Sequence, residues 1–175
     1  MYRSLLTLVL VFIATACATI PPGERAAIRE ELDANAEEML AQLTEKIPRF
    51  SEKLEESVGY LAGSVSGVKG PLAGGGYGRA VLVDRELETR SYLDITRLDV
   101  GAGLGTGKVR AFVLFQNRAL MEGFARGVRQ PMLRAASVAG ESSEYAVQQG
   151  DGYLIFLAAE KGAALTATAA LVKAR

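Results

Sequence analysis

The sequence predicts an α+β protein with a curved, partly closed antiparallel sheet, packed with N-terminal amphipathic helices and one short internal helix. Three observations lead to this prediction. Apolar residues recur at helical spacing in the N-terminal third, up to about residue 58. From residue 59 the pattern changes to glycine and period-two alternation, which indicates strands. The connections between these strands leave no room for long crossover helices, so we expect antiparallel neighbours.

The composition sets limits on both size and chemistry. A chain of 175 residues, of which 49% are hydrophobic and 23% charged, fits one globular domain and excludes a disordered chain. The 20 basic and 20 acidic residues balance, so nothing points to nucleic acid as a partner. With no histidine and a single cysteine, the chain lacks the residues for histidine-based catalysis, for Cys/His zinc sites and for an internal disulfide.

The N-terminus is typical of an export signal. A short basic start precedes an apolar run from Leu5 to Ile13, which is well short of the ~20 residues that span a bilayer. Cys17 then resembles the acylated cysteine of bacterial lipoproteins, although Ala14 stands where a large aliphatic residue is usual. An ordinary signal peptidase could also cut here and leave Cys17 as a free thiol. The predicted organisation is a signal peptide over residues 1–16, a lipidated linker over 17–25 and a single domain over 26–175.

Two amphipathic helices are expected at the start of the domain. One apolar stripe has spacings of four and seven and ends at Pro48; it consists of Ile28, Leu32, Met39, Leu43 and Ile47. A second helix is predicted from Phe50 to about Tyr60. The polar side of the first helix is acidic, which is the wrong sign for anionic lipid, so we expect packing onto the sheet rather than onto a membrane.

The remaining chain predicts short strands and one helix. The strands fall near 81–83, 92–95, 110–115, 152–157 and 165–171, and the helix covers Arg118–Arg126. The glycines of 74–78 and 101–107 alternate but match neither a dinucleotide-binding motif nor a phosphate-binding P-loop. Alternation puts them on one strand face, which suits a face pressed against another backbone or a helix.

Candidate catalytic carboxylates are few. Asp84, Glu86 and Glu88 alternate after a strand and could serve acid–base chemistry or a hard metal ion. Arginines are interleaved with them, which is more typical of a solvated hairpin with cross-strand ion pairs. We therefore predict no catalytic residue, no metal site, no cofactor and no enzymatic activity.

The balanced total charge conceals an uneven distribution. Residues 18–57 carry ten acids and five bases, whereas residues 69–134 carry eleven bases and six acids. The second segment could present a basic face to an anionic partner. Alternatively, the acidic helix lies over the basic face and the two charges cancel within the molecule.

An ordered series of short motifs carries a family resemblance. The runs are GGGYGRAVLVD at 74–84, RSYL at 90–93, VGAGLG at 100–105, VLF at 113–115, GDGY at 150–153 and EKGAAL at 160–165. Together they resemble the SYLF domain, also called the Ysc84-type domain, in its bacterial lipoprotein branch. The resemblance implies binding and not catalysis: eukaryotic members bind phosphoinositide-containing membranes, and bacterial members are described as lipid-binding.

A site for lipid head groups needs fixed cations beside an aromatic surface. The candidates near the glycine turns are Lys69, Arg79, Lys108 and Arg110, with Tyr77 and Tyr92. The expected protein is thus a lipid-anchored, non-enzymatic module that contacts anionic phospholipid, on the periplasmic face of a bacterial outer membrane. Two alternatives remain open: an envelope protein–protein interaction module that uses the same basic face, and a carrier of a hydrophobic ligand.

Overall fold

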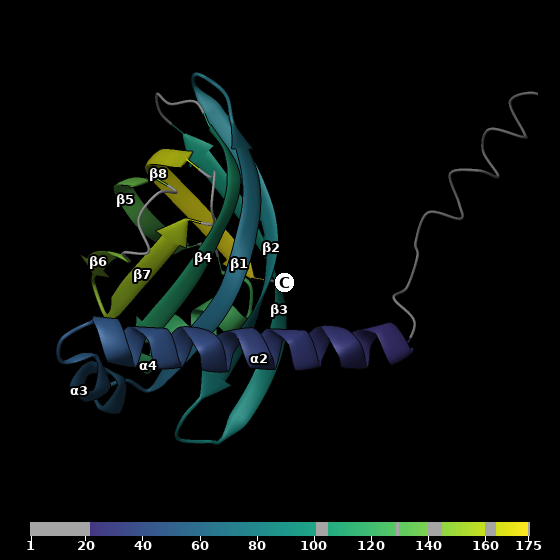
Figure 1. Cartoon of the computed structure of the whole chain (residues 1–175), viewed down its shortest axis with the longest axis vertical. Helices are drawn as coiled ribbons and strands as arrows, with labels where there is room; N and C mark the ends of the chain where they lie inside the picture. The colour runs from purple at the N-terminus through teal and green to yellow at the C-terminus, as the bar shows by residue number, and fades with distance from the viewer. Residues whose placement is uncertain (1–21, 101–104, 129, 140–144, 160–163, 175) are drawn as a thin grey trace, which may run out of the picture.

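The computed structural model describes residues 22–100, 105–128, 130–139, 145–159 and 164–174 (Figure 1). Within these ranges the helices are α2 (Pro22–Lys46), α3 (Phe50–Glu55) and α4 (Arg118–Ala125). The strands are β1 (Gly59–Lys69), β2 (Ala73–Asp84), β3 (Thr89–Val100), β4 (Gly105–Phe115), β5 (Gln130–Ala139), β6 (Ala146–Gly150), β7 (Tyr153–Ala159) and β8 (Ala164–Ala174).

All strands belong to one antiparallel sheet with the order β5-β8-β3-β2-β1-β4-β7-β6. The two outermost strands of this order, β5 and β6, are not hydrogen-bonded to each other, so the sheet is not closed. Figure 1 shows the long central strands bending as they pass α2. The predicted α+β class, with an antiparallel sheet and a few helices, is confirmed.

Helix α2 crosses one face of the sheet, which we call the outer face (Figure 1). Its apolar stripe packs against buried side chains of the central strands, among them Val81, Phe112 and Phe156. The helix begins at Pro22, inside the stretch predicted as linker. Proline is tolerated there because the first-turn N–H groups have no partner within a helix.

The second helix is shorter than predicted. Helix α3 ends at Glu55, and Tyr60 lies in strand β1, so the prediction of a helix to about Tyr60 is wrong. The Ser57 hydroxyl donates to the Leu54 carbonyl at 2.6 Å and satisfies an acceptor at the end of the helix. Just beyond, a side chain at Gly59 would collide with the carbonyl oxygen of Val83, so the chain enters the sheet at a glycine.

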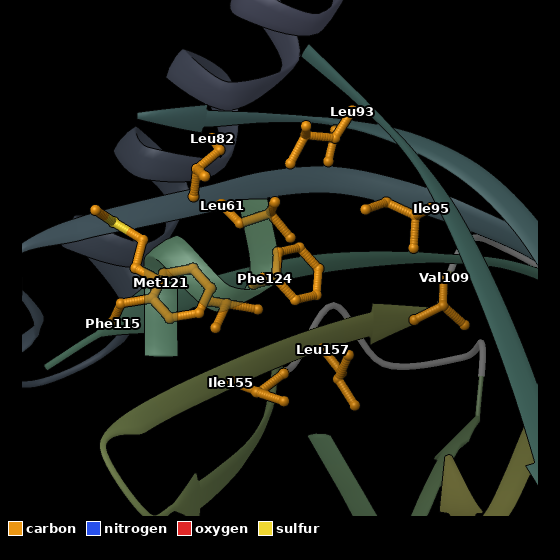
Figure 2. Packing of buried hydrophobic residues seen from close by; sticks show 12 residues of the cluster. Leu61, Leu82, Leu93, Ile95, Val109, Phe115, Met121, Phe124, Ile155 and Leu157 are labelled. Carbon is orange, nitrogen blue, oxygen red and sulfur yellow. The ribbon is translucent and has the colours of Figure 1, made fainter. Parts of the chain in front are cut away.

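The opposite, inner face of the sheet has its own core (Figure 2). Phe124 and Met121 of α4 lie against apolar side chains of β1, β2, β3, β4 and β7. On this face a side chain at Gly63 would collide with the carbonyl oxygen of Arg79 on the neighbouring strand. The sheet is therefore buried on both faces beside α2 and α4, and the alternating glycines permit close approach of backbones.

Candidate functional site

Alternate residues of β3, β2, β1 and β4 form parallel rows across the outer face. The row under α2 contains Tyr92, Val81, Ala62 and Phe112. The next three rows, moving away from α2, are Asp94–Arg79–Ser64–Arg110, then Thr96–Tyr77–Ser66–Lys108, then Leu98–Gly75–Val68–Thr106. The outer face thus changes from apolar to charged, then to hydroxyl-rich with one lysine, and then back to partly apolar.

Two of the predicted lipid-binding residues, Tyr77 and Arg79, share one carboxylate. The Tyr77 hydroxyl donates to Oδ1 of Asp94 at 2.5 Å, and Nε of Arg79 lies 3.5 Å from the same oxygen. The hydrogen bond to Asp94 raises the pKa of Tyr77 above its usual value. This carboxylate fixes a tyrosine and a guanidinium side by side on the outer face.

Two other predicted residues face α2 instead of solvent. Arg110 donates to Glu38 at 3.1 Å and to Gln42 at 3.0 Å, both on α2. The Tyr92 hydroxyl donates to Asp33 of α2 at 2.7 Å, which raises the pKa of Tyr92. At this point the acidic helix lies over the basic face, so the charges of Arg110 and Glu38 cancel within the molecule.

The predicted set is therefore divided by the structure. Arg79 lies in the row next to α2, Tyr77 and Lys108 share the row beyond it, and Lys108 is exposed. The backbone of Lys69 pairs with Gly74 and Gly105 at the far end of the same strands. Arg110 and Tyr92 connect the sheet to α2. The side chain of Lys69 and all of Cys17 lie outside the described residues.

Exposed apolar side chains gather at the end of the outer face that α2 leaves uncovered. We call the group of Val68, Leu72, Tyr77 and Leu98 the open patch; their exposed fractions are 63%, 77%, 53% and 43%. Leu72 lies in the turn between β1 and β2, at the end of the sheet away from α2 (Figure 1). Clustered exposed apolar residues mark interaction surfaces, whereas isolated ones do not. The patch as a whole is not visible in the sequence because its members lie on three strands and one turn.

The interpretation of Asp84 as part of a solvated hairpin is wrong. Asp84 is buried and accepts two hydrogen bonds from Arg118 of α4, at 2.8 and 3.0 Å. It also accepts from the backbone N–H groups of Glu86 and Leu87 in the turn. These donors lower the pKa of Asp84 to about 2, mainly through Arg118. The carboxylate therefore joins a turn to a helix.

Tyr92→Phe is expected to lower the free energy of unfolding by about 1 kcal/mol, because a partly buried hydrogen bond to Asp33 is lost. The same variant should bind anionic vesicles as the unchanged protein does, since the ring and its packing remain. Urea denaturation and vesicle co-sedimentation measure the two effects. Weaker vesicle binding by a variant of unchanged stability would instead make Tyr92 a lipid contact.

Comparison with known proteins finds no matching family model, no matching curated protein and no matching solved structure. In the described part of the chain, no helix combines the length and apolar character needed to cross a bilayer. The described residues also contain no group of three or more metal-ligating side chains.

Proposed function

We propose that this protein is a lipid-anchored, SYLF-like module that contacts anionic phospholipid of the bacterial envelope through the open patch and the cations beside it. One observation carries the proposal: on the outer face, the exposed apolar residues Val68 and Leu98 lie in the last row, and Tyr77 and Lys108 occupy the row before it. A protein surface that enters a membrane interface has this order. Apolar side chains reach the acyl region, while tyrosines and cations stay at head-group level.

The expected free energies of binding are consistent with reversible contact between the open patch and a membrane. Transfer of exposed aliphatic side chains such as Val68 and Leu72 out of water contributes about 1.5–3 kcal/mol each when burial is complete. Each lysine near an anionic surface adds about 1 kcal/mol, and this attraction weakens with salt. Together these contributions give a moderate affinity that is measurable without an anchor, and a second attachment at the surface would strengthen it.

Acylation of Cys17 would supply that attachment. Five peptide units separate Cys17 from Pro22, where α2 begins, and they span at most about 18 Å. The acyl anchor would thus keep the N-terminal end of α2 close to the membrane, on the same side of the sheet as the open patch. Ala18 after the cysteine, where aspartate is absent, favours the outer membrane as the location.

Vesicle co-sedimentation tests this proposal with residues 18–175, which retain every described element and lack the acyl anchor. We expect binding to vesicles that contain anionic lipid, weakened by salt, and little binding to zwitterionic vesicles. The double variant Val68→Ser/Leu72→Ser should lower the affinity about tenfold or more. Lys69→Gln/Lys108→Gln should lower it to a similar extent at low salt and less at high salt.

A matched control distinguishes binding through the open patch from nonspecific hydrophobic adsorption. Leu87 in the turn between β2 and β3 and Val147 on β6 are also exposed apolar residues, and both lie away from the open patch. Leu87→Ser/Val147→Ser should leave vesicle binding unchanged. If both apolar double variants behave alike, or if the protein stays in the supernatant under all conditions, the membrane contact is refuted. Recovery of one partner protein with the intact patch would then support the protein-interaction alternative.

The carrier alternative has a specific structural basis on the inner face. An apolar cavity of about 50 Å³ lies there between Ala80, Ala111 and Phe124. It is smaller than an engineered cavity of about 150 Å³ that accepts benzene, so a lipid chain would enter only if the sheet opened. In this alternative, a partly closed sheet would surround the acyl chain of a bound lipid. Lipid extracted from the purified protein would support it.

A further inference from the structure

Three arginines line a groove between the N-terminal half of α2 and strands β2 and β3. The groove has a volume of about 170 Å³, and its arginines are Arg25, Arg29 and Arg79. Asp94 is the one carboxylate among the described lining residues. Apolar side chains of Ile28 and Leu32 on α2 complete the walls. The groove is therefore a concave site with excess positive charge.

One of these arginines is held in place by an aromatic ring. The guanidinium carbon of Arg29 lies 5.1 Å from the centroid of the Tyr92 ring. Tyr92 is itself fixed by its hydrogen bond to Asp33. A guanidinium that packs against a ring uses its face, and its N–H donors remain directed outward in the plane. Such an arginine is prepared to bind an anion with little loss of side-chain entropy.

The charge in the groove is not balanced by its own carboxylate. Asp94 interacts with both Arg79 and Tyr77, so its negative charge is already shared. Arg25 and Arg29 lie four residues apart on one helix, an arrangement in which like charges repel. Arg25 also lies near the positive end of the α2 dipole, where anions and not cations are favoured. An anion bound between Arg25 and Arg29 would offset the repulsion between these like charges.

We infer that this groove is a binding site for a phosphate-type dianion, coordinated by Arg25, Arg29 and Arg79. Arginine matches the geometry of phosphate oxygens because two N–H groups can donate in parallel. The same chemistry is offered by free phosphate and by the phosphomonoester head group of a lipid. The inference does not depend on the membrane contact proposed above, because the groove lies beside α2 and the open patch lies beyond it.

The test is a titration of the full chain in uncharged detergent micelles, followed by the NMR signals of the arginine Nε–H groups. Inorganic phosphate is the first probe, added at constant ionic strength with chloride as the reference anion. The second arm compares micelles containing phosphatidate, a phosphomonoester, with micelles containing phosphatidylglycerol, a phosphodiester. We expect saturable shifts of the arginine signals, and a loss of affinity of about tenfold or more in Arg25→Gln/Arg29→Gln.

The matched control removes two cations elsewhere. Lys53 and Arg126 form exposed ion pairs with Glu56 and Glu122, so Lys53→Gln/Arg126→Gln has little effect on folding. Saturable shifts with inorganic phosphate, lost only in the groove variant, support a site for free phosphate. Shifts with phosphatidate but with neither inorganic phosphate nor phosphatidylglycerol assign the same site to a lipid head group. Equal responses of the two variants, or no saturation with any probe, overturn the inference.

Discussion

Phe112→Ala is expected to lower the free energy of unfolding by about 3–5 kcal/mol, more than any other single substitution proposed for this chain. Phe112 is completely buried on the outer face of the sheet. Its ring stacks on Tyr60 with centroids 5.0 Å apart and meets the edge of Phe50 at 5.7 Å. Removal of the ring leaves a cavity between α3 and the sheet that the rigid strands cannot fill.

Urea denaturation gives this difference in free energy, and two controls define its origin. Phe112→Leu should recover much of the loss because it refills most of the cavity. Leu87→Ala, at an exposed apolar position, should change the stability by less than about 0.5 kcal/mol. A loss of under about 1 kcal/mol in Phe112→Ala would mean that α3 does not pack on the sheet as described.

Asp84→Asn is expected to destabilise the protein by about 2 kcal/mol at neutral pH and to remove part of its sensitivity to acid. The folded-state pKa of Asp84 is about 2, below the ordinary value of 3.8. A lowered pKa means that the folded state holds the carboxylate form more strongly than the unfolded state does. Its contribution is therefore present above pH ~4 and is lost as the pH falls toward 2.

Denaturation curves measured between neutral pH and pH ~2 test this linkage. The difference between the unchanged protein and Asp84→Asn should shrink as the pH falls through this range. Glu86→Gln is the matched control, because Glu86 also pairs with Arg118 but is largely exposed, and it should have little effect. Parallel stability curves for the unchanged protein and Asp84→Asn would show that Arg118 does not stabilise the carboxylate.

Strong periodic patterns located several elements well. The stripe of α2 predicted both the helix and the face that it buries, and α4 begins at Arg118, where the sequence placed it. Strands β4 and β7 were predicted from continuous apolar runs. These runs are readable because both faces of the central sheet are buried, so apolar residues occupy consecutive positions.

The sequence was less informative where glycine replaces apolar side chains. Strand β2 begins at Ala73, well before the predicted segment at 81–83, because its first residues are mostly glycines that carry no alternation signal. Strand β1, in which glycines and serines are frequent, was not predicted, and neither were β5 and β6. Both lie at the ends of the sheet order, and β6 is a short segment rich in glutamine. The position of such strands is determined by pairing with an adjacent strand and not by their own composition.

The candidate site was predicted only in part because side-chain partners are not visible in a one-dimensional pattern. Arg79 and Arg110 occupy the same row of the sheet, on either side of Ser64. Only the position of α2 distinguishes them, since Glu38 lies over Arg110. The arginine groove was missed for the same reason, because Arg25 and Arg29 were counted with an acidic segment whose net charge concealed them.

The strand order has a consequence for the growing polypeptide. Strand β3 pairs on one side with β2, its neighbour in sequence, and on the other side with β8, the last strand. Ile95 can pair with β8 only after Ala174 has been synthesised. Until then the N–H and C=O groups along this edge of β3 have no strand to pair with, and unpaired edges template aggregation. A nascent or truncated chain that lacks β8 therefore exposes an unpaired strand edge. Pairing of β8 with β3 protects the protein against aggregation through this edge.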